Sequence, residues 1–240
     1  MIYNQEQGYQ RNHVIVQGSE KALDEFLNST TVIKGERVKH KLEYSYSSNS
    51  EDALTWSCFD TLRNYKPENL VGALNEILED AFENNKPFDF RYEKNIKIEI
   101  GKEYIAPTLT KEKTEVDISI ETDDKLIFIE AKLYSKISLP DKDKPHDQLI
   151  KKLRVGLDVA KHENKKFYFI FLDIAPIDYT LKFGVKSVNA EYFKQYKDNS
   201  NTLADKLIEN SYKNLEEVSQ NMGWLTWASL FKTVLRAVIK

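Results

Sequence analysis

Two short strand-like segments joined by a polar turn constrain the fold of this chain more than any other feature. Val116 to Glu121 and Leu126 to Leu133 are rich in isoleucine and other residues that favour β-structure. The turn between them, Thr122-Asp123-Asp124-Lys125, is short and polar. Together these three segments predict a β-hairpin.

The hairpin register follows from the position of the turn. A symmetric loop places Asp117 opposite Glu130, and Glu115 opposite Lys132. Because side chains alternate along a strand, these four charged residues are expected on one face of the hairpin. The opposite face is apolar and is expected to meet the core. It comprises Val116, Ile118, Ile120, Ile127, Ile129, Ala131 and Leu133.

Two opposed carboxylates are unfavourable unless something compensates their charge. At ~5 Å and an effective dielectric constant of ~20, Asp117 and Glu130 would repel each other by about 3 kcal/mol. A hard divalent cation reverses the sign of that interaction, and Mg²⁺ accepts one or two carboxylates while it keeps water and phosphate oxygens. Lys132 would lie beside such an ion, where its ammonium group could hold an attacking water or stabilise charge on a phosphoryl group.

The segments around the hairpin predict an α/β fold with a central mixed sheet and flanking helices. A strand, helix, strand order after the hairpin implies one parallel pairing. No linker rich in proline, glycine or serine divides the chain, so we expect one domain over 1–240, with a core at about 50–175, an amino-terminal extension at 1–45 and a helical extension at 176–240. The expected strands are 13–17, a pair through Val38 and Tyr44, 96–100 and 167–174, and the expected helices are 19–27, 51–62, 68–82, 147–162 and the region 189–240.

The hairpin and the elements after it resemble the core of the PD-(D/E)XK nuclease superfamily, which has the restriction-endonuclease-like fold. The resemblance is carried by Val116-Asp117, a turn, and Ile129-Glu130-Ala131-Lys132, followed by a helix and an apolar strand. Val116 stands where the family name has proline, a position that is loosely kept in the family. The similar region covers at most about Glu51 to Ile174.

This resemblance implies a site. Members bind divalent metal through the acidic residues and use the lysine in phosphodiester hydrolysis. It marks Asp117 and Glu130 as metal ligands, Lys132 as the catalytic lysine and the Ala131 carbonyl as a further ligand. It also suggests Glu51, on the preceding helix, as a catalytic residue and ligand, and Gln148, on the following helix, as a catalytic residue.

The charge and composition of the chain limit the classes of partner and ligand that it can bind. The formal net charge of -3 excludes a wholly basic nucleic-acid coat, and one cysteine with four scattered histidines gives no zinc spacing. No apolar run approaches the ~20 residues of a membrane helix, so we expect a cytoplasmic protein without membrane contact. Between Lys125 and Lys166, eleven basic residues outnumber six acidic ones. The candidates for DNA phosphate contact there are Lys136, Lys144, Lys151, Lys152 and Arg154.

The leading hypothesis is a Mg²⁺-dependent DNA endonuclease, with Mn²⁺ as a substitute, acting in restriction, phage defence or repair. Alternatives are a catalytically inactive nuclease-fold module in a defence complex and an RNA-directed or nucleotide-activated effector nuclease. A homodimer also stays open. The candidate site residues also have explanations that need no catalytic role. The charged face of the hairpin could be a salt-bridged surface. Gln148, and Glu51 or the neighbouring Asp52 that could take its place, occupy first-turn helix positions that are favourable in themselves.

Overall fold

The computed structural model describes residues 51–109, 112–142, 145–178, 188–207 and 214–239, together with the backbone of four short strands. These short strands form two antiparallel pairs, namely β1 (Thr31–Ile33) with β2 (Glu36–Val38) and β7 (Thr180–Leu181) with β8 (Val185–Lys186). The predicted strand at 13–17, the helix at 19–27 and Tyr44 lie outside the described residues.

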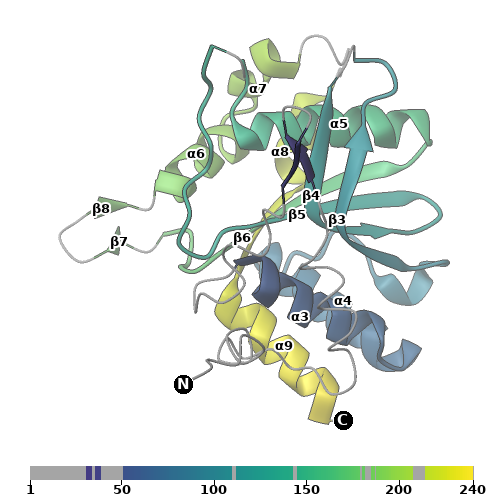
Figure 1. Ribbon diagram of the computed structural model, residues 1–240. Coiled ribbons are helices and arrows are strands. Elements are labelled where there is room, and N and C mark those ends of the chain that lie inside the picture. Colours follow the sequence, from purple (N-terminus) through teal and green to yellow (C-terminus); the bar gives the residue numbers. More distant parts are fainter. Residues whose placement is uncertain are drawn as a thin grey trace.

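A five-stranded mixed sheet forms the centre of the molecule (Figure 1). Its order is β3-β4-β5-β6-β9, in which the first three strands form an antiparallel meander and β6 and β9 continue the sheet in parallel with β5. The predicted parallel pairing is therefore confirmed, between β5 and β6. The bounds are β3 (Lys97–Ile105), β4 (Lys113–Glu121), β5 (Lys125–Ala131), β6 (Lys166–Asp173) and β9 (Met222–Thr226).

One face of the sheet is covered by three helices, α3 (Glu51–Arg63), α4 (Pro67–Ala81) and α9 (Trp227–Ile239) (Figure 1). Pro67 occupies the first turn of α4, where its missing N–H costs no helical hydrogen bond. The 3₁₀ helix η3 (Phe90–Tyr92) connects this layer to β3. The core on this side combines apolar stripes of the helices with Ile118, Ile120, Ile127 and Ile129 of the hairpin.

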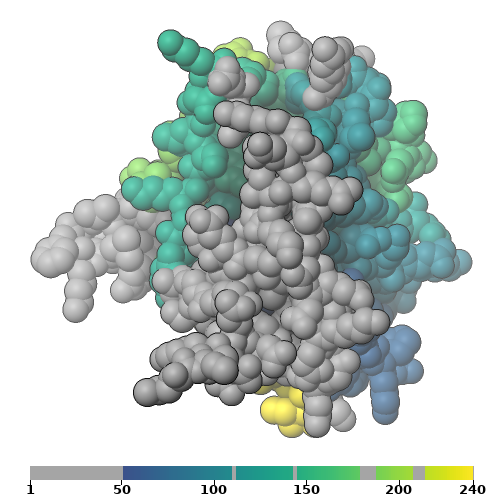
Figure 2. Space-filling model, viewed as in Figure 1, coloured from purple at the N-terminus to yellow at the C-terminus, as the bar shows by residue number. Residues whose placement is uncertain are grey.

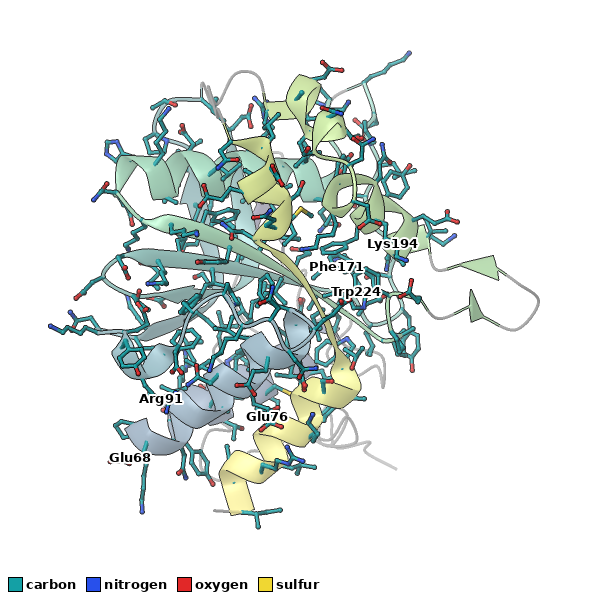
Figure 3. All side chains as sticks on the ribbon, turned by 180° about the vertical axis from the view of Figure 1, so that it is seen from behind. Glu68, Glu76, Arg91, Phe171, Lys194 and Trp224 are labelled. Carbon is teal, nitrogen blue, oxygen red and sulfur yellow. The ribbon has the colours of Figure 1, made fainter. Side chains whose placement is uncertain are left out.

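The second face is covered by α5 (Gln148–His162), which crosses from β5 to β6, and by α6 (Val188–Lys197), α7 (Ser200–Leu207) and α8 (Leu215–Gln220). Asp147 caps α5 by accepting a hydrogen bond from the backbone N–H of Ile150 at 2.9 Å. Aromatic residues fill this core. Phe171 and Trp224 lie side by side beneath α6, with ring centroids 5.1 Å apart (Figure 3). Both faces are thus buried, and the α/β fold class is confirmed.

The predicted hairpin register is confirmed, because Ile118 pairs with Ile129 and Ile120 pairs with Ile127. One member of the predicted apolar face is wrong. Val116 packs in the core beneath α5, on the opposite side from Ile118. The change of side falls at Asp117, next to Gly101 of β3, whose φ of 64° lies in the left-handed region. Gly101 and Asp117 interrupt the β3–β4 ladder between its pairs on either side.

The prediction that 189–240 is entirely helical is also wrong, because β9 lies within it. Met222 to Thr226 pair with β6, and four of these five residues are buried. The pairing with a distant strand decides their conformation, and a run this short shows no periodicity of its own. Within the described residues, no helix combines the length and apolar character needed to cross a membrane.

Candidate active site

Strands β4 and β5 separate at the candidate site. The β4–β5 ladder ends at the pair of Ile118 and Ile129, so the predicted direct pairs, Asp117 with Glu130 and Glu115 with Lys132, do not form part of it. Instead, Oδ2 of Asp117 accepts a hydrogen bond from the backbone N–H of Ala131 at 2.8 Å. A carboxylate thus replaces a backbone carbonyl as partner of β5, which keeps Asp117 near Glu130 while the strands diverge.

Glu130 lies in the interior, with 1% of its surface exposed, and its carboxylate is held from three sides. Nζ of Lys132 lies 2.8 Å from Oε1, Nζ of Lys152 lies 2.7 Å from Oε2, and the amide of Gln148 donates a hydrogen bond to Oε1. Burial alone would raise the pKa of Glu130, but the ammonium groups of Lys152 and Lys132 outweigh burial and lower it to about 2. Glu130 is therefore a buried carboxylate at neutral pH.

Asp117 differs from Glu130 because no cation of the described residues lies within ion-pair distance of its carboxylate. Burial and the charge of Glu130 raise the pKa of Asp117 to about 7, against the opposing fields of Lys152 and Lys132. The two neighbouring carboxylates thus have pKa values shifted in opposite directions, that of Glu130 downward and that of Asp117 upward. The repulsion between the two carboxylates is the one expected from the sequence, and the positive charges of Lys132 and Lys152 partly compensate it.

Two side chains from separate helices connect the charged cluster to the segment that follows β5. Glu51 is the first residue of α3, and its carboxylate lies 3.5 Å from Nζ of Lys132 and accepts hydrogen bonds from the N–H of Leu133 (2.7 Å) and the hydroxyl of Ser135 (2.8 Å). Gln148, at the start of α5, contacts Glu130. The structure therefore brings both residues into the cluster, and Glu51, rather than Asp52, makes the contact with Lys132.

The backbone of Lys132 is fixed by two elements that the sequence analysis did not connect to the site. Its carbonyl accepts a hydrogen bond from the indole N–H of Trp227 at 3.0 Å, and its N–H donates to the carbonyl of Leu172 at 2.7 Å. Burial alone would lower the pKa of Lys132, but Glu130, Asp117 and Glu51 outweigh burial and raise it. The raised pKa favours the charged ammonium form of Lys132 at neutral pH.

The predicted DNA-contact residues separate into exposed and internal ones. Lys136 and Lys151 are exposed, and Lys144 lies outside the described residues. Lys152 is buried against Glu130, and its ammonium also donates to the carbonyl of Glu115. Lys152 and Gln148 are one helical turn apart, so their spacing of four residues was the signal that both face the same side of α5.

Arg154 is likewise internal, with 1% of its surface exposed. Its Nε lies 2.9 Å from Oε2 of Glu112, and its Nη1 donates to the carbonyl of Lys206 at 2.6 Å. In this structure the guanidinium group of Arg154 and the ammonium group of Lys152 bind internal partners and do not extend to the surface, where a phosphate could bind. Both side chains therefore lie inside the protein in this structure, and their contact with DNA stays a prediction.

The oxygen atoms of the site fit a hard divalent cation. Asp117 and Glu130 supply carboxylates, and the Ala131 carbonyl accepts a hydrogen bond from Nζ of Lys132 at 3.0 Å. Oε2 of Glu130 is a buried atom that makes no hydrogen bond of normal geometry, although Lys152 lies near it. Over the described residues, no group of three or more His, Cys, Asp and Glu side chains is arranged to hold a metal. The fit therefore rests on two carboxylates and a carbonyl, the number that Mg²⁺ accepts while keeping water.

The most prominent cleft lies elsewhere, between the end of α4 and α6, and has a volume of about 670 Å³. Phe82, Lys197 and Trp224 are among its lining residues, and no candidate catalytic residue is. The ionised cluster and this cleft are therefore separate places. We base the functional analysis on the cluster, because it combines buried charge with perturbed pKa values.

Comparisons of the chain with models of known protein families, with curated proteins and with solved structures found no match. What the site can do is therefore derived from its own geometry. Side chains from α3, β4, β5 and α5 meet at one place, and they combine carboxylates with a lysine whose pKa is raised.

Proposed function

We propose that this protein is a Mg²⁺-dependent DNA endonuclease that hydrolyses phosphodiester bonds, with a role in restriction, phage defence or repair. The observation that carries the proposal is the meeting of Asp117, Glu130 and Lys132 at the point where β4 and β5 separate. Burying two carboxylates side by side is unfavourable for folding, and it has a chemical purpose if a divalent cation binds between them.

The order of elements supports a restriction-endonuclease-like core. Helices α3 and α4 precede an antiparallel meander, which is followed by α5 and the parallel strand β6. The motif occupies the last two strands of this meander, as the resemblance implies. Glu51 and Gln148 reach the same cluster from the helices on either side of the meander in the chain.

Asp117, Glu130 and the Ala131 carbonyl would hold Mg²⁺. When bound, this ion supplies a Lewis acid that stabilises charge on the phosphoryl group. Lys132, kept protonated by its carboxylate neighbours, places a positive charge where the phosphate oxygens gain negative charge.

Gln148 and Lys152 hold the Glu130 carboxylate in one orientation, and Glu51 restricts the movement of the Lys132 side chain. Lys136 and Lys151, both exposed, would contact the DNA backbone.

Cleavage of DNA by the purified chain tests this proposal. Plasmid and oligonucleotide substrates are incubated with Mg²⁺, Mn²⁺ or EDTA, and the variants Asp117→Asn, Glu130→Gln and Lys132→Ala are compared with Lys97→Ala. Lys97 is an exposed residue at the start of β3, where it pairs with Glu121, four residues from Asp117 along β4. We expect metal-dependent cleavage that falls by at least about 100-fold in the three site variants and is unchanged in the control. Cleavage by the wild-type protein in EDTA, or cleavage by Lys132→Ala at the wild-type rate, would contradict the proposal.

One observation favours a second candidate, an inactive nuclease-fold module. Lys132 and Lys152 already neutralise Glu130 from inside, so the cluster can persist without metal. Circular dichroism and calorimetry separate the two candidates: an inactive module keeps its fold, gives no heat on titration with Mn²⁺ and cleaves no nucleic acid. A panel that includes RNA separates both from an RNA-directed nuclease.

A further inference from the structure

The segment 133–138, which directly follows the catalytic strand, has no regular secondary structure but is held firmly. Glu51 binds it at Leu133 and Ser135. Asn189 of α6 binds it again, by accepting from the N–H of Ile137 at 3.0 Å and donating to the carbonyl of Ser135 at 3.1 Å. Gln148 closes the set through two hydrogen bonds with the backbone of Ser138 (2.9 and 3.2 Å).

Glu51 and Gln148 therefore each have two functions in the structure. With one part of the side chain they contact Lys132 or Glu130, and with another they hold the segment 133–138. The position of this segment is consequently fixed relative to the catalytic groups. A binding residue on it would be preorganised, which lowers the entropic cost of engaging a substrate.

Tyr134 is the large aromatic residue of this segment, and 66% of its surface is exposed although Leu133 and Ile137 on either side are buried. It lies two residues from Lys132, and two residues of extended chain span about 7 Å at most. Exposed Lys136 lies two residues further along. The space-filling view shows teal-green atoms of this part of the chain at the surface of the molecule (Figure 2).

We propose that Tyr134 stacks on an unpaired base next to the phosphate held at Lys132, so that the preferred substrate is single-stranded DNA or DNA with an unstacked base. The inference rests on the proposed nuclease function. An aromatic ring can stack on any base, but only on one whose face is free, and bases inside a duplex cover one another. Lys136 would follow the phosphate backbone of the same strand.

Steady-state cleavage of one oligonucleotide as a single strand and as a perfect duplex tests the inference. The variants are Tyr134→Ala, Tyr134→Phe and, as matched control, Tyr92→Ala. Tyr92 is 80% exposed and belongs to η3, whose neighbour Glu93 pairs with Lys125 at the opposite end of β5 from Glu130. Quenching of a 2-aminopurine base, measured in Ca²⁺, reports stacking directly.

We expect wild type to prefer the single strand by at least about 10-fold in kcat/KM. Tyr134→Ala should raise KM for it by about 10- to 100-fold, with little change in kcat and loss of the quenching. Tyr134→Phe should restore both, because phenylalanine keeps the aromatic face, and Tyr92→Ala should match wild type. The inference would be overturned, while the nuclease function stands, if the duplex were cleaved as well as or better than the single strand. It would also be overturned if the KM of Tyr134→Ala for the single strand lay within twofold of that of Tyr92→Ala. Quenching that depends on Tyr134 without cleavage of any substrate would instead support stacking and overturn the proposed catalysis.

Discussion

The ammonium group of Lys152 lies 2.7 Å from Oε2 of Glu130, inside the protein, where a composition rich in lysine pointed to a DNA-binding surface. With only 6% of the Lys152 side chain and 1% of the Glu130 side chain exposed, water screens this pair very little. The pair keeps the carboxylate of Glu130 ionised in the interior. It also makes the stability of the protein depend on the candidate site.

Replacing Lys152 with methionine should therefore destabilise the metal-free protein. The apolar stem is retained, but Glu130 keeps Lys132 as its only ion-pair partner among the described residues, so the free energy of unfolding should fall by about 2–4 kcal/mol. Urea denaturation in EDTA measures this. Lys151→Met, at the exposed neighbouring position, should change it by less than about 0.5 kcal/mol. Saturating Mn²⁺ should reduce the deficit, since a cation at Glu130 compensates the same charge. An equal effect of both substitutions would contradict the assignment.

Asp117→Asn should stabilise the metal-free protein, and more so at high pH. The raised pKa of about 7 means that folded Asp117 binds its proton more tightly than unfolded Asp117, whose pKa is 3.8. Its contribution to stability therefore falls as pH rises from about 4 to about 7, and the full penalty is present above that range. Asparagine can still accept the hydrogen bond from Ala131 but carries no charge. We expect its stability advantage to grow by about 1–3 kcal/mol between pH 5 and pH 8, measured by denaturation in EDTA. A lower stability than wild type at pH 8 would refute this.

Trp227 and Trp224 offer a matched pair of substitutions. Each indole N–H donates to a buried backbone carbonyl at 3.0 Å, that of Lys132 for Trp227 and that of Ala175 for Trp224. Changing either to phenylalanine should cost about 1–3 kcal/mol of stability, because a carbonyl loses its partner. If Lys132 acts in catalysis as proposed, only Trp227→Phe should also lower kcat, by about 10-fold, since it releases the backbone of Lys132. Equal effects on kcat would show that Trp227 is structural alone.

Two helical glycines should respond in opposite ways to alanine. A Cβ at Gly156 of α5 would overlap the ring of Phe167 and lie 2.9 Å from that of Phe128, so Gly156→Ala should destabilise by about 2–3 kcal/mol or more. A Cβ at Gly72 of α4 meets nothing within 4 Å, so Gly72→Ala should stabilise by about 0.5–1 kcal/mol through helix propensity. Thermal unfolding compares them. Tolerance of alanine at Gly156 would contradict the packing of α5 on β5 and β6.

The hairpin register was predictable from sequence because a slip of one residue would move side chains such as Ile118 and Ile129 to the opposite face of the sheet. Local pattern therefore determined which acidic residues lie near each other. It also identified the starts of α3 and α5, which carry Glu51 and Gln148. These features depend on short-range periodicity and on capping, both of which can be read from a single sequence.

The features that were missed depend on distant partners. Strand β9 is a strand because it pairs with β6, about fifty residues earlier in the chain. Lys152 is buried because Glu130 on another element compensates its charge, and composition alone favours solvent for a lysine. The hydrogen bond of Trp227 to Lys132 joins residues 95 positions apart. Of these features, only Lys152 left a local signal, namely its spacing of four residues from Gln148 on α5.

Titration calorimetry with Mn²⁺ at pH 8 tests the central claim most directly, namely that Asp117 and Glu130 together hold a divalent cation. We predict saturable binding to wild type, weakened by at least about 10-fold in Asp117→Asn and in Glu130→Gln. Glu68→Gln, an exposed carboxylate in the first turn of α4, should bind as wild type does. No saturable heat with wild type, or equal affinity in Asp117→Asn, would contradict the account.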